Sequence, residues 1–352
     1  MKIVTIVGAR PQFIKAAPLS RVLRQRHSEV LVHTGQHYDR NMSEVFFDEL
    51  GIPPPDYNLA VGSGPHGGQT GQMLERIEDV LLKERPERVL VYGDTNSTLA
   101  GALAAAKLHL PIGHVEAGLR SFNRRMPEEL NRLVSDHLAD LLLCPSAQAA
   151  ENLKAEGITR GVHVVGDVMA DALCYALAAA RNRSRILEKL HLTPDHYLLA
   201  TIHRPENTDA PQRLRQLMEA FAHIPEPVIL PLHPRTRKQL DQLGLAASDN
   251  PRFIEPLGYL DMVALEQAAR LILTDSGGIQ KEAYWLGVPC ITLREQTEWV
   301  ETVAAGWNVV AGAEMERILE LVRSFAPPAA RPELYGDGQA AARCAALLGE
   351  RG

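Results

Sequence analysis

Residues 271–286 read Leu-Ile-Leu-Thr-Asp-Ser-Gly-Gly-Ile-Gln-Lys-Glu-Ala-Tyr-Trp-Leu, an apolar strand that runs into a helix. The turn between them is Ser276-Gly277-Gly278, and a glycine pair lowers helix propensity and therefore needs a reason. Glycines let a backbone approach a phosphate closely, and amide groups at a helix N-terminus favour an anion. An ordinary helix cap at Ser276 is the plainer alternative. Glu282 follows about one helical turn later, where a carboxylate can accept hydrogen bonds from ribose hydroxyl groups.

The same alternation of strand and helix runs through the whole chain. Short β-branched runs alternate with segments of helical apolar spacing, such as 71–83, 97–108 and 212–222. Several of the strands are continuously apolar, as strands covered on both faces are. The pattern predicts parallel sheets with helices on both faces. The predicted strands are Ile3–Val7, Val30–His33, Val89–Tyr92, Ile112–Val115, Leu141–Cys144, Val162–Val165, Tyr197–Thr201, Val228–Leu230, Phe253–Ile254, Leu271–Thr274, Cys290–Thr292 and Val309–Val310.

Two series of strands predict an α/β fold with two Rossmann-like domains. A single eight-stranded barrel ranks second, because it would not account for about four of the strands. We place the boundary so that the N-terminal domain covers 1–167 and the C-terminal domain covers 168–352, with a closing helix near 339–348. Open parallel sheets bind ligands at the carboxyl ends of their strands. If the domains face each other, the cleft between them is the active site.

The composition of the chain excludes several classes of protein. The chain has 352 residues, 37 of them Lys or Arg and 43 Asp or Glu, and the net charge of −6 argues against a nucleic-acid partner. The four cysteines form neither a CxxC motif nor a disulfide framework, so we expect reduced thiols. No apolar run is long enough for a membrane span, and the N-terminal apolar stretch is too short for a signal peptide. We therefore expect a soluble, cytoplasmic protein.

Two further strand ends carry basic groups. The first strand is followed by Arg10, Pro11 and Lys15, and the strand-to-helix turn with two cations suits a phosphate. Two solvated cations beside a glycine turn are the alternative. In the second half of the chain, His203 and His233 each follow a strand and stand next to an arginine or a proline-arginine pair. A lone histidine is usually structural, but this arrangement resembles the wall of a polyphosphate site.

Carboxylates follow strands of the first domain. Asp94 and Glu116 each stand just after a strand, and Glu128 and Glu129 begin a helix. Asp94 could be a helix cap, and the two glutamates could simply complement the helix dipole. Glu116 has no such explanation, because a carboxylate directly after an apolar strand is costly without a partner. Several acids together indicate proton transfer. Metal binding is the rival, but no usual ligand spacing accompanies the acids, so we expect no metal.

One sequence match to a dinucleotide-binding motif is rejected. Residues 62–67 match G-x-G-x-x-G, but they follow no clean buried strand and contain Pro65. A dinucleotide site needs a strand–turn–helix context. We interpret 62–71 as a mobile glycine-rich loop and candidate lid, and we expect no nicotinamide cofactor.

Taken together, these segments resemble the non-hydrolysing UDP-N-acetylglucosamine 2-epimerase family. The resemblance covers nearly the whole chain. The matching segments are GARPQFIK at 8–15, TGQHYD at 34–39, GDTNSTLAGALAA at 93–105, HVEAGLRS at 114–121, MPEELNR at 126–132, VGDVMAD at 165–171, HRPEN at 203–207, LHPRTR at 232–237 and TDSGGIQKEA at 274–283.

The resemblance implies a glycosyltransferase-B architecture, with two Rossmann-like domains around a cleft, and a homodimer. It implies interconversion of UDP-N-acetylglucosamine (UDP-GlcNAc) and UDP-N-acetylmannosamine through elimination of UDP and its re-addition, without a cofactor. By motif position, the essential carboxylates would be Asp94, Glu116 and Glu128, and His203 would stabilise the leaving diphosphate. The residues that would bind the substrate are Arg10, Lys15, Arg132, His233, Ser276, Gly277, Gly278, Glu282 and Arg294.

The chain departs from the family pattern in two places. Many members read Thr-Glu-Arg-Pro-Glu where this chain has Thr-Glu-Trp-Val-Glu at 297–301. Together with TGQHYDRNMSEVFFDELGI at 34–52, this segment resembles a subgroup that includes archaeal epimerases and epimerases of UDP-2,3-diacetamido-2,3-dideoxy-glucuronate. Substrate-regulated bacterial members carry glutamines where residues 38–42 read Tyr-Asp-Arg-Asn-Met, which argues against allosteric activation.

Three rival functions stay open at this point. The nearest is the same epimerisation of the diacetamido-glucuronate sugar, which needs an extra basic contact for its carboxylate. A hydrolysing epimerase would release free N-acetylmannosamine. A nucleotide-sugar-binding regulator would have a dead site, and the presence of Asp94, Glu116, Glu128 and His203 argues against it.

Overall fold

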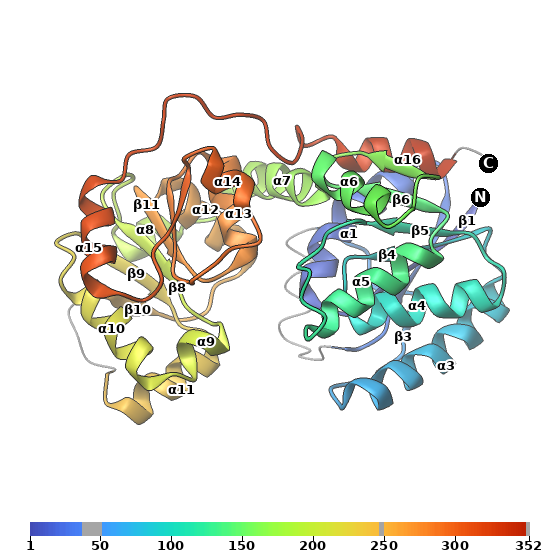
Figure 1. Ribbon diagram of the computed structural model, residues 1–352, viewed down its shortest axis with the longest axis horizontal. Coiled ribbons are helices and arrows are strands. Elements are labelled where there is room, and N and C mark those ends of the chain that lie inside the picture. The colour runs from blue at the N-terminus through green and yellow to red at the C-terminus, as the bar shows by residue number, and fades with distance from the viewer. Residues whose placement is uncertain (37–50, 246–249, 350–352) are drawn as a thin grey trace. The chain divides into compact units, whose positions relative to one another are not determined.

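The computed structural model describes residues 1–36, 51–245 and 250–349, and the chain forms two compact units (Figure 1). The first unit comprises Met1–Tyr175 and Tyr335–Gly352, and the second comprises Ala176–Leu334. The side chains of Arg10, Pro234 and Arg235 are outside the description. The expectation about allosteric activation falls on residues 38–42 and therefore also lies outside the described residues.

A parallel sheet of seven strands forms the centre of the first unit, in the order β3-β2-β1-β4-β5-β6-β7. Strands β4, β5 and β6 are almost entirely buried, which explains their largely apolar sequences. Six strands were predicted, and the two-residue edge strand β3 was missed. The bounds are β1 Lys2–Val7, β2 Ser28–His33, β3 Tyr57–Asn58, β4 Arg88–Tyr92, β5 Ile112–Val115, β6 Leu141–Cys144 and β7 Val162–Val164.

Helices cover this sheet, and α3, α4 and α5 pack side by side along it (Figure 1). Helix α4 is rich in alanine because it lies close to the strands. A Cβ atom at its Gly101 would come within 2.8 Å of Ile6 and 3.0 Å of Val91. The helices of this unit are α1 Arg10–Leu23, α3 His66–Glu84, α4 Asn96–Lys107, α5 Pro127–Leu138, α6 Ala147–Ala155 and α16 Ala340–Gly349.

The glycine-rich stretch is partly helical, so its interpretation as a loop throughout 62–71 was wrong. Helix α3 begins at His66, directly after Pro65, and includes three of the glycines. The Gln69 side chain donates to the carbonyl oxygen of Gly62 at 2.7 Å and holds the preceding turn against the helix. Extensive packing of α3 on α4 outweighs the low helix propensity of glycine.

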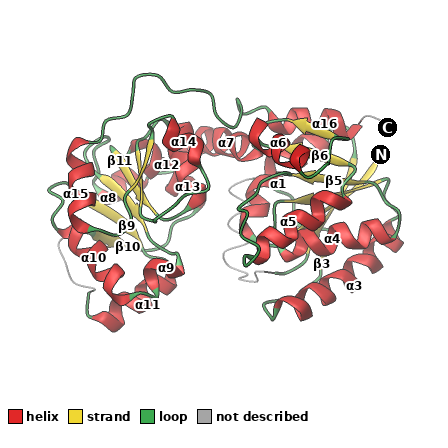
Figure 2. Ribbon diagram, viewed as in Figure 1, coloured by secondary structure: helices red, strands yellow, loops and turns green. Residues whose placement is uncertain are grey.

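The second unit has a parallel sheet of six strands in the order β10-β9-β8-β11-β12-β13, again with helices around it (Figure 2). All six strands were predicted. They are β8 Leu198–Thr201, β9 Val228–Pro231, β10 Arg252–Ile254, β11 Leu271–Thr274, β12 Cys290–Thr292 and β13 Asn308–Val310. The helices are α8 Ile186–Leu190, α9 Pro205–Thr208, α10 Pro211–Ala222, α11 Pro234–Leu243, α12 Tyr259–Ala268, α13 Gly277–Leu286, α14 Val300–Ala304 and α15 Met315–Ser324.

The chain passes between the units twice. Helix α7, Val168–Arg183, contains the first crossing, and the chain returns to the first unit at Tyr335. The closing helix α16, expected in the second domain, instead packs on α1 of the first unit. Asp171 holds its start, because its carboxylate accepts hydrogen bonds from the amides of Ala340 and Ala341 at 3.0 Å each.

Two observations concern the cysteines and the possibility of a membrane-spanning helix. All four cysteines are unpaired, and Cys174 is the exposed one. Within the described ranges, no helix combines the length and the hydropathy that a bilayer-spanning segment requires.

Candidate active site

The turn after β1 is rigid and closely packed. Gln12 accepts hydrogen bonds from the amides of Gly8 (2.8 Å) and Ala9 (3.1 Å), and its own amide donates to the Tyr92 carbonyl oxygen at 2.7 Å. A Cβ atom at Gly8 would lie only 2.0 Å from the Ser97 hydroxyl oxygen, so only glycine fits there. The amides of Gly8 and Ala9 are thus occupied within the chain. Any anion at this turn must rely on other groups.

Lys15 and Glu116 form a buried ion pair at the carboxyl end of the first sheet. The Lys15 ammonium group hydrogen-bonds to the Glu116 carboxylate, and both side chains are largely buried. Burial lowers the pKa of Lys15, but the nearby Glu116 and Asp94 carboxylates outweigh it and leave the pKa raised. Lys15 therefore stays charged and gives Glu116 the partner that its buried position requires.

The backbone at Glu116 is strained. Its φ of +69° lies in the left-handed region, which residues other than glycine rarely adopt. The Glu116 amide still donates to the Leu143 carbonyl oxygen at 3.0 Å, so the neighbouring strand fixes this conformation. Gly93, at the end of β4, has a φ of +61°, and a Cβ atom there would lie 3.1 Å from the Glu116 carboxylate. Strain of this kind is typical of functional positions.

Asp94 lies beside this pair and has its own cation. Its carboxylate accepts a hydrogen bond from Arg132 of α5 at 2.5 Å, and its side chain is 30% exposed. The Asn131 side chain donates to the Asp94 backbone carbonyl at 2.9 Å. Burial lowers the pKa of Arg132, but Asp94 outweighs it and the pKa is raised. Asp94 is thus held in place and still reaches solvent.

The two glutamates at the start of α5 differ. Glu129 is buried and accepts hydrogen bonds from the Ser121 amide at 2.8 Å and the Phe122 amide at 2.9 Å. These bonds fix the loop before α5, so Glu129 is structural. Glu128 is exposed in the first turn of α5, one turn before Arg132 and on the same face of the helix.

In the second unit, Ser276 caps α13. Its hydroxyl oxygen accepts a hydrogen bond from the Ile279 amide at 3.5 Å, so the capping interpretation is correct for this side chain. The glycines still matter, since a Cβ atom at Gly277 would lie 2.5 Å from the Glu298 carboxylate. Glu282, 5% exposed on α13, accepts a hydrogen bond from the Tyr259 hydroxyl at 2.8 Å.

His203 and His233 lie next to each other, with ring centroids 6.5 Å apart. The segment that carries His203 is fixed by Asp275, which is completely buried. The Asp275 carboxylate accepts hydrogen bonds from the backbone amides of His203 (3.1 Å) and Arg204 (3.0 Å). It also accepts one from the Asn207 side chain at 3.1 Å. Two strand ends of one sheet thus bring imidazole groups together.

Arg294 lies close to the start of α13 and is paired with a carboxylate. It donates to Glu298 at 2.7 Å, and Arg204 lies 3.8 Å from the same group. Burial raises the pKa of Glu298, but Arg294 outweighs it and keeps the pKa below the usual range. An ionised carboxylate therefore lies over Gly277 and between two arginines.

The structure thus gathers the predicted residues into two groups, one in each unit. The first group is Lys15, Asp94, Glu116, Arg132 and, on the same helix face, Glu128. The second is His203, His233, Ser276, Gly277, Gly278, Glu282 and Arg294. The position of the Arg10 side chain is not described. Across the described ranges, no group of three or more His, Cys, Asp or Glu side chains is arranged to hold a metal ion.

Sequence reasoning missed four residues that support these groups: Gln12, Asn131, Asp275 and Glu298. The only signal for Asp275 was its position beside Ser276, directly after a buried strand. Glu298 could have been found from the departure at 297–301, which places it next to the glycine pair.

The fold and the two groups of side chains define an α/β enzyme of the glycosyltransferase-B type, with two Rossmann-like units. A sequence profile of the UDP-N-acetylglucosamine 2-epimerase family matches residues 21–349. The chain belongs to this family of epimerases.

Two curated relatives and one solved structure illustrate the similarity. The chain is 53% identical to a UDP-2,3-diacetamido-2,3-dideoxy-D-glucuronate 2-epimerase of Pseudomonas aeruginosa, with 99% of each chain covered. It is 47% identical to a UDP-N-acetylglucosamine 2-epimerase of Methanococcus maripaludis, over 92% of this chain and 91% of the relative. The Methanocaldococcus jannaschii UDP-GlcNAc 2-epimerase, solved in complex with UDP-GlcNAc and UDP, superposes with a TM-score of 0.89 at 43% identity, and 99% of each chain is covered.

Proposed function

We propose that this protein interconverts UDP-GlcNAc and UDP-N-acetylmannosamine at C2. The observation that carries the proposal is the group of ionisable side chains at the ends of β4 and β5. Two carboxylates, Asp94 and Glu116, are each held by their own cation, Arg132 and Lys15. Such paired acids, fixed by a strained backbone, suit proton transfer at a carbon atom.

The reaction has two chemical tasks. In the elimination, a base removes the proton from C2, and the electron pair of that C–H bond forms a double bond between C1 and C2. The C1–O bond breaks at the same time, and its electron pair leaves with UDP. Re-addition reverses these steps and delivers a proton to the opposite face of C2. We propose that Asp94, Glu116 and Glu128 are the acids and bases, since a change of face requires more than one such group.

The second group suits the departing UDP. The amides at the start of α13 and the imidazole groups of His203 and His233 favour an anion. Glu282 offers a carboxylate for ribose hydroxyl groups. We therefore propose that the C-terminal domain binds UDP and the N-terminal domain acts on the sugar. Arg10, Lys15, Arg132, Ser276, Gly277, Gly278 and Arg294 complete the proposed substrate contacts.

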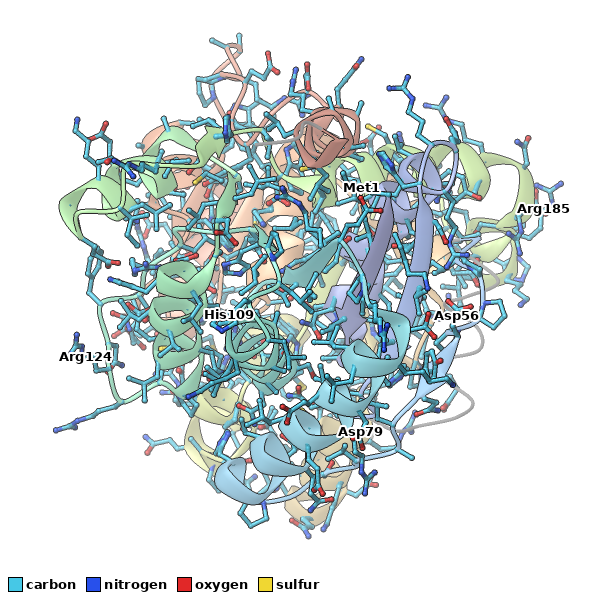
Figure 3. All side chains as sticks on the ribbon, turned by 90° about the vertical axis from the view of Figure 1, so that its right-hand side faces the viewer. Met1, Asp56, Asp79, His109, Arg124 and Arg185 are labelled. Atoms are coloured by element: carbon cyan, nitrogen blue, oxygen red, sulfur yellow. The ribbon has the colours of Figure 1, made fainter. Side chains whose placement is uncertain are left out.

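A second substrate is favoured by one specific observation. The chain is more similar to the Pseudomonas diacetamido-glucuronate epimerase, at 53% identity, than to the Methanococcus UDP-GlcNAc epimerase, at 47%. A glucuronate sugar needs a basic contact for its carboxylate. Arg124 projects outward from the segment that joins Glu116 to α5 (Figure 3) and offers such a group.

The experiment is incubation of the protein with UDP-GlcNAc in deuterated water, followed by NMR. We expect an epimer that carries deuterium at C2 and no free sugar. Release of free N-acetylmannosamine would point to a hydrolysing enzyme. Turnover of the diacetamido-glucuronate alone would move the assignment to the second substrate, and binding without turnover of either would favour a regulator. Asp94→Asn with full activity would remove Asp94 from the mechanism.

We also propose a homodimer in the cytoplasm. Leu130 and Val134 are exposed and lie four residues apart on α5, so they form one apolar face. The unpaired cysteines suit a reducing compartment. Sedimentation of the purified protein tests the dimer, and a double Leu130→Glu, Val134→Glu variant tests this face. A monomeric parent protein would contradict the proposal.

A further inference from the structure

His114 lies on β5 and is completely buried, two residues before Glu116 in sequence. Both of its ring nitrogens are hydrogen-bonded. Nε2 lies 2.8 Å from the carbonyl oxygen of Gly93, and Nδ1 lies 2.7 Å from the Asp136 carboxylate. A carbonyl oxygen can only accept a hydrogen bond, so Nε2 carries a proton. The charge of His114 therefore depends on whether the second proton lies on Nδ1 or on Asp136.

The surroundings of Asp136 assign that proton to His114. The other oxygen of the Asp136 carboxylate accepts hydrogen bonds from Arg120 at 2.7 Å and from the Gly118 amide at 3.1 Å. These donors favour the ionised carboxylate. Burial raises the pKa of Asp136, but His114 and Arg120 outweigh it and leave the pKa lowered. Burial likewise lowers the pKa of His114, and Asp136 outweighs it, so the pKa is raised.

The charges around His114 come from several elements. On α5 there is Asp136, and Arg120 and Glu116 follow β5. Glu156, at the end of α6, binds Arg120 through two hydrogen bonds of 2.7 Å each. Lys15 on α1 and Arg132 on α5 interact with Glu116. Asp94, after β4, interacts with both of these cations. The network of His114, Asp136, Arg120 and the partly exposed Glu156 is electrically balanced when His114 is an imidazolium.

We propose that His114 is a permanently protonated positioning residue for the carboxylates of the first unit. Its Nε2–H group holds the Gly93 carbonyl and thereby the turn that carries Asp94. Its positive charge, two residues before Glu116 in sequence, favours the ionised form of that carboxylate, which a base at C2 needs. The catalytic part of this inference rests on the proposed epimerase function. The protonation state does not.

The first test is NMR of the full-length protein with ¹⁵N-labelled histidine, without substrate. The His114 signals are assigned as those lost in the His114→Gln variant. We expect both ring nitrogens to remain protonated at pH 8, well above the ordinary pKa of histidine. A deprotonated ring nitrogen at that pH would overturn the proposal. Because no turnover is required, a failure of the epimerase assignment would not affect this result.

The second test is the pH profile of epimerisation by His114→Gln. Glutamine can still donate to the Gly93 carbonyl but carries no charge. We expect kcat to fall roughly 10-fold with little change in KM, and the acid limb of kcat/KM to move up by about one pH unit. His137→Gln, an exposed change on α5 next to Asp136, is the matched control and should behave like the parent. An unshifted acid limb in a folded His114→Gln variant would refute the electrostatic role.

Discussion

Asp275 gives a sharp test of how the second unit is held together. Its buried carboxylate accepts hydrogen bonds from two backbone amides and one side-chain amide, and it lies 3.4 Å from the His203 ring. Asp275→Asn preserves size and shape but replaces one acceptor oxygen with an NH₂ group. That group faces donors in either orientation. The Asp275 oxygen that accepts from Arg204 and Asn207 also lies 3.1 Å from the His203 amide, so the asparagine can keep all three donors satisfied only if its NH₂ group takes the other position. There the NH₂ group is a buried donor that opposes the His203 amide at 3.1 Å, and the remaining bonds lose the assistance of a charge.

The expected cost follows from these contacts. An unsatisfied buried donor costs about 1–3 kcal/mol, and a hydrogen bond to a charged group is worth about 1 kcal/mol more than a neutral one. Together these terms give a loss of about 3 kcal/mol in the free energy of unfolding. In urea this corresponds to a midpoint lower by about 1–1.5 M at an ordinary m-value.

Urea unfolding followed by circular dichroism measures this loss, and UDP binding by calorimetry measures its effect on the His203 segment. Asp261→Asn is the matched control. Asp261 lies in the same unit and accepts a hydrogen bond from the Ser184 hydroxyl at 2.6 Å, so we expect a loss under about 1 kcal/mol. If both variants unfold at the same urea concentration, the argument that Asp275 organises this segment is incorrect.

Three further predictions concern single side chains. Gly8→Ala should destabilise the protein by about 1–3 kcal/mol in thermal unfolding, because its methyl group overlaps the Ser97 hydroxyl; an unchanged Tm would contradict the packing argument. Burial lowers the pKa of His33 to about 4, so its neutral form stabilises the fold above pH 6.5, and up to about 3 kcal/mol is lost as the pH falls from 6.5 towards 4. His33→Gln should flatten that part of the stability profile, and an unaltered profile would exclude His33 as its source. Glu298→Gln should tighten UDP binding by about 3-fold to 10-fold, because it removes the carboxylate that binds Arg294 at 2.7 Å and leaves only the more distant Glu206 at 3.9 Å; weaker binding in calorimetry would show that Glu298 assists the ligand.

Much of the fold follows from local patterns. The buried parallel strands are continuously apolar and of ordinary length, so their positions could be predicted closely. The start of α3 could not, because its glycines are poor helix formers and only the packing on α4 stabilises them. The position of α16 depends on its contacts with α1 and Asp171, far away in sequence, and no local pattern records such contacts.

The candidate site, like the fold, could be predicted from sequence only in part. Asp94, Glu116 and His203 follow strands, and the carboxyl ends of parallel strands are where ligand-binding side chains are expected. Asp275 and His114 could not be assigned roles from sequence, because these depend on partners 72 and 22 residues away. An acid or imidazole acquires its function from the donors and charges around it, and only the folded chain brings those together.

The double passage of the chain between the units affects how the protein is made. During synthesis, residues 1–175 leave the ribosome first, and N-terminal domains generally fold first. Yet α16, which covers α1, emerges only after the entire second unit has been translated. The α1 surface that receives α16 therefore stays uncovered through nearly half of translation. Isolating the first unit as a stable fragment requires that the closing helix be supplied with it.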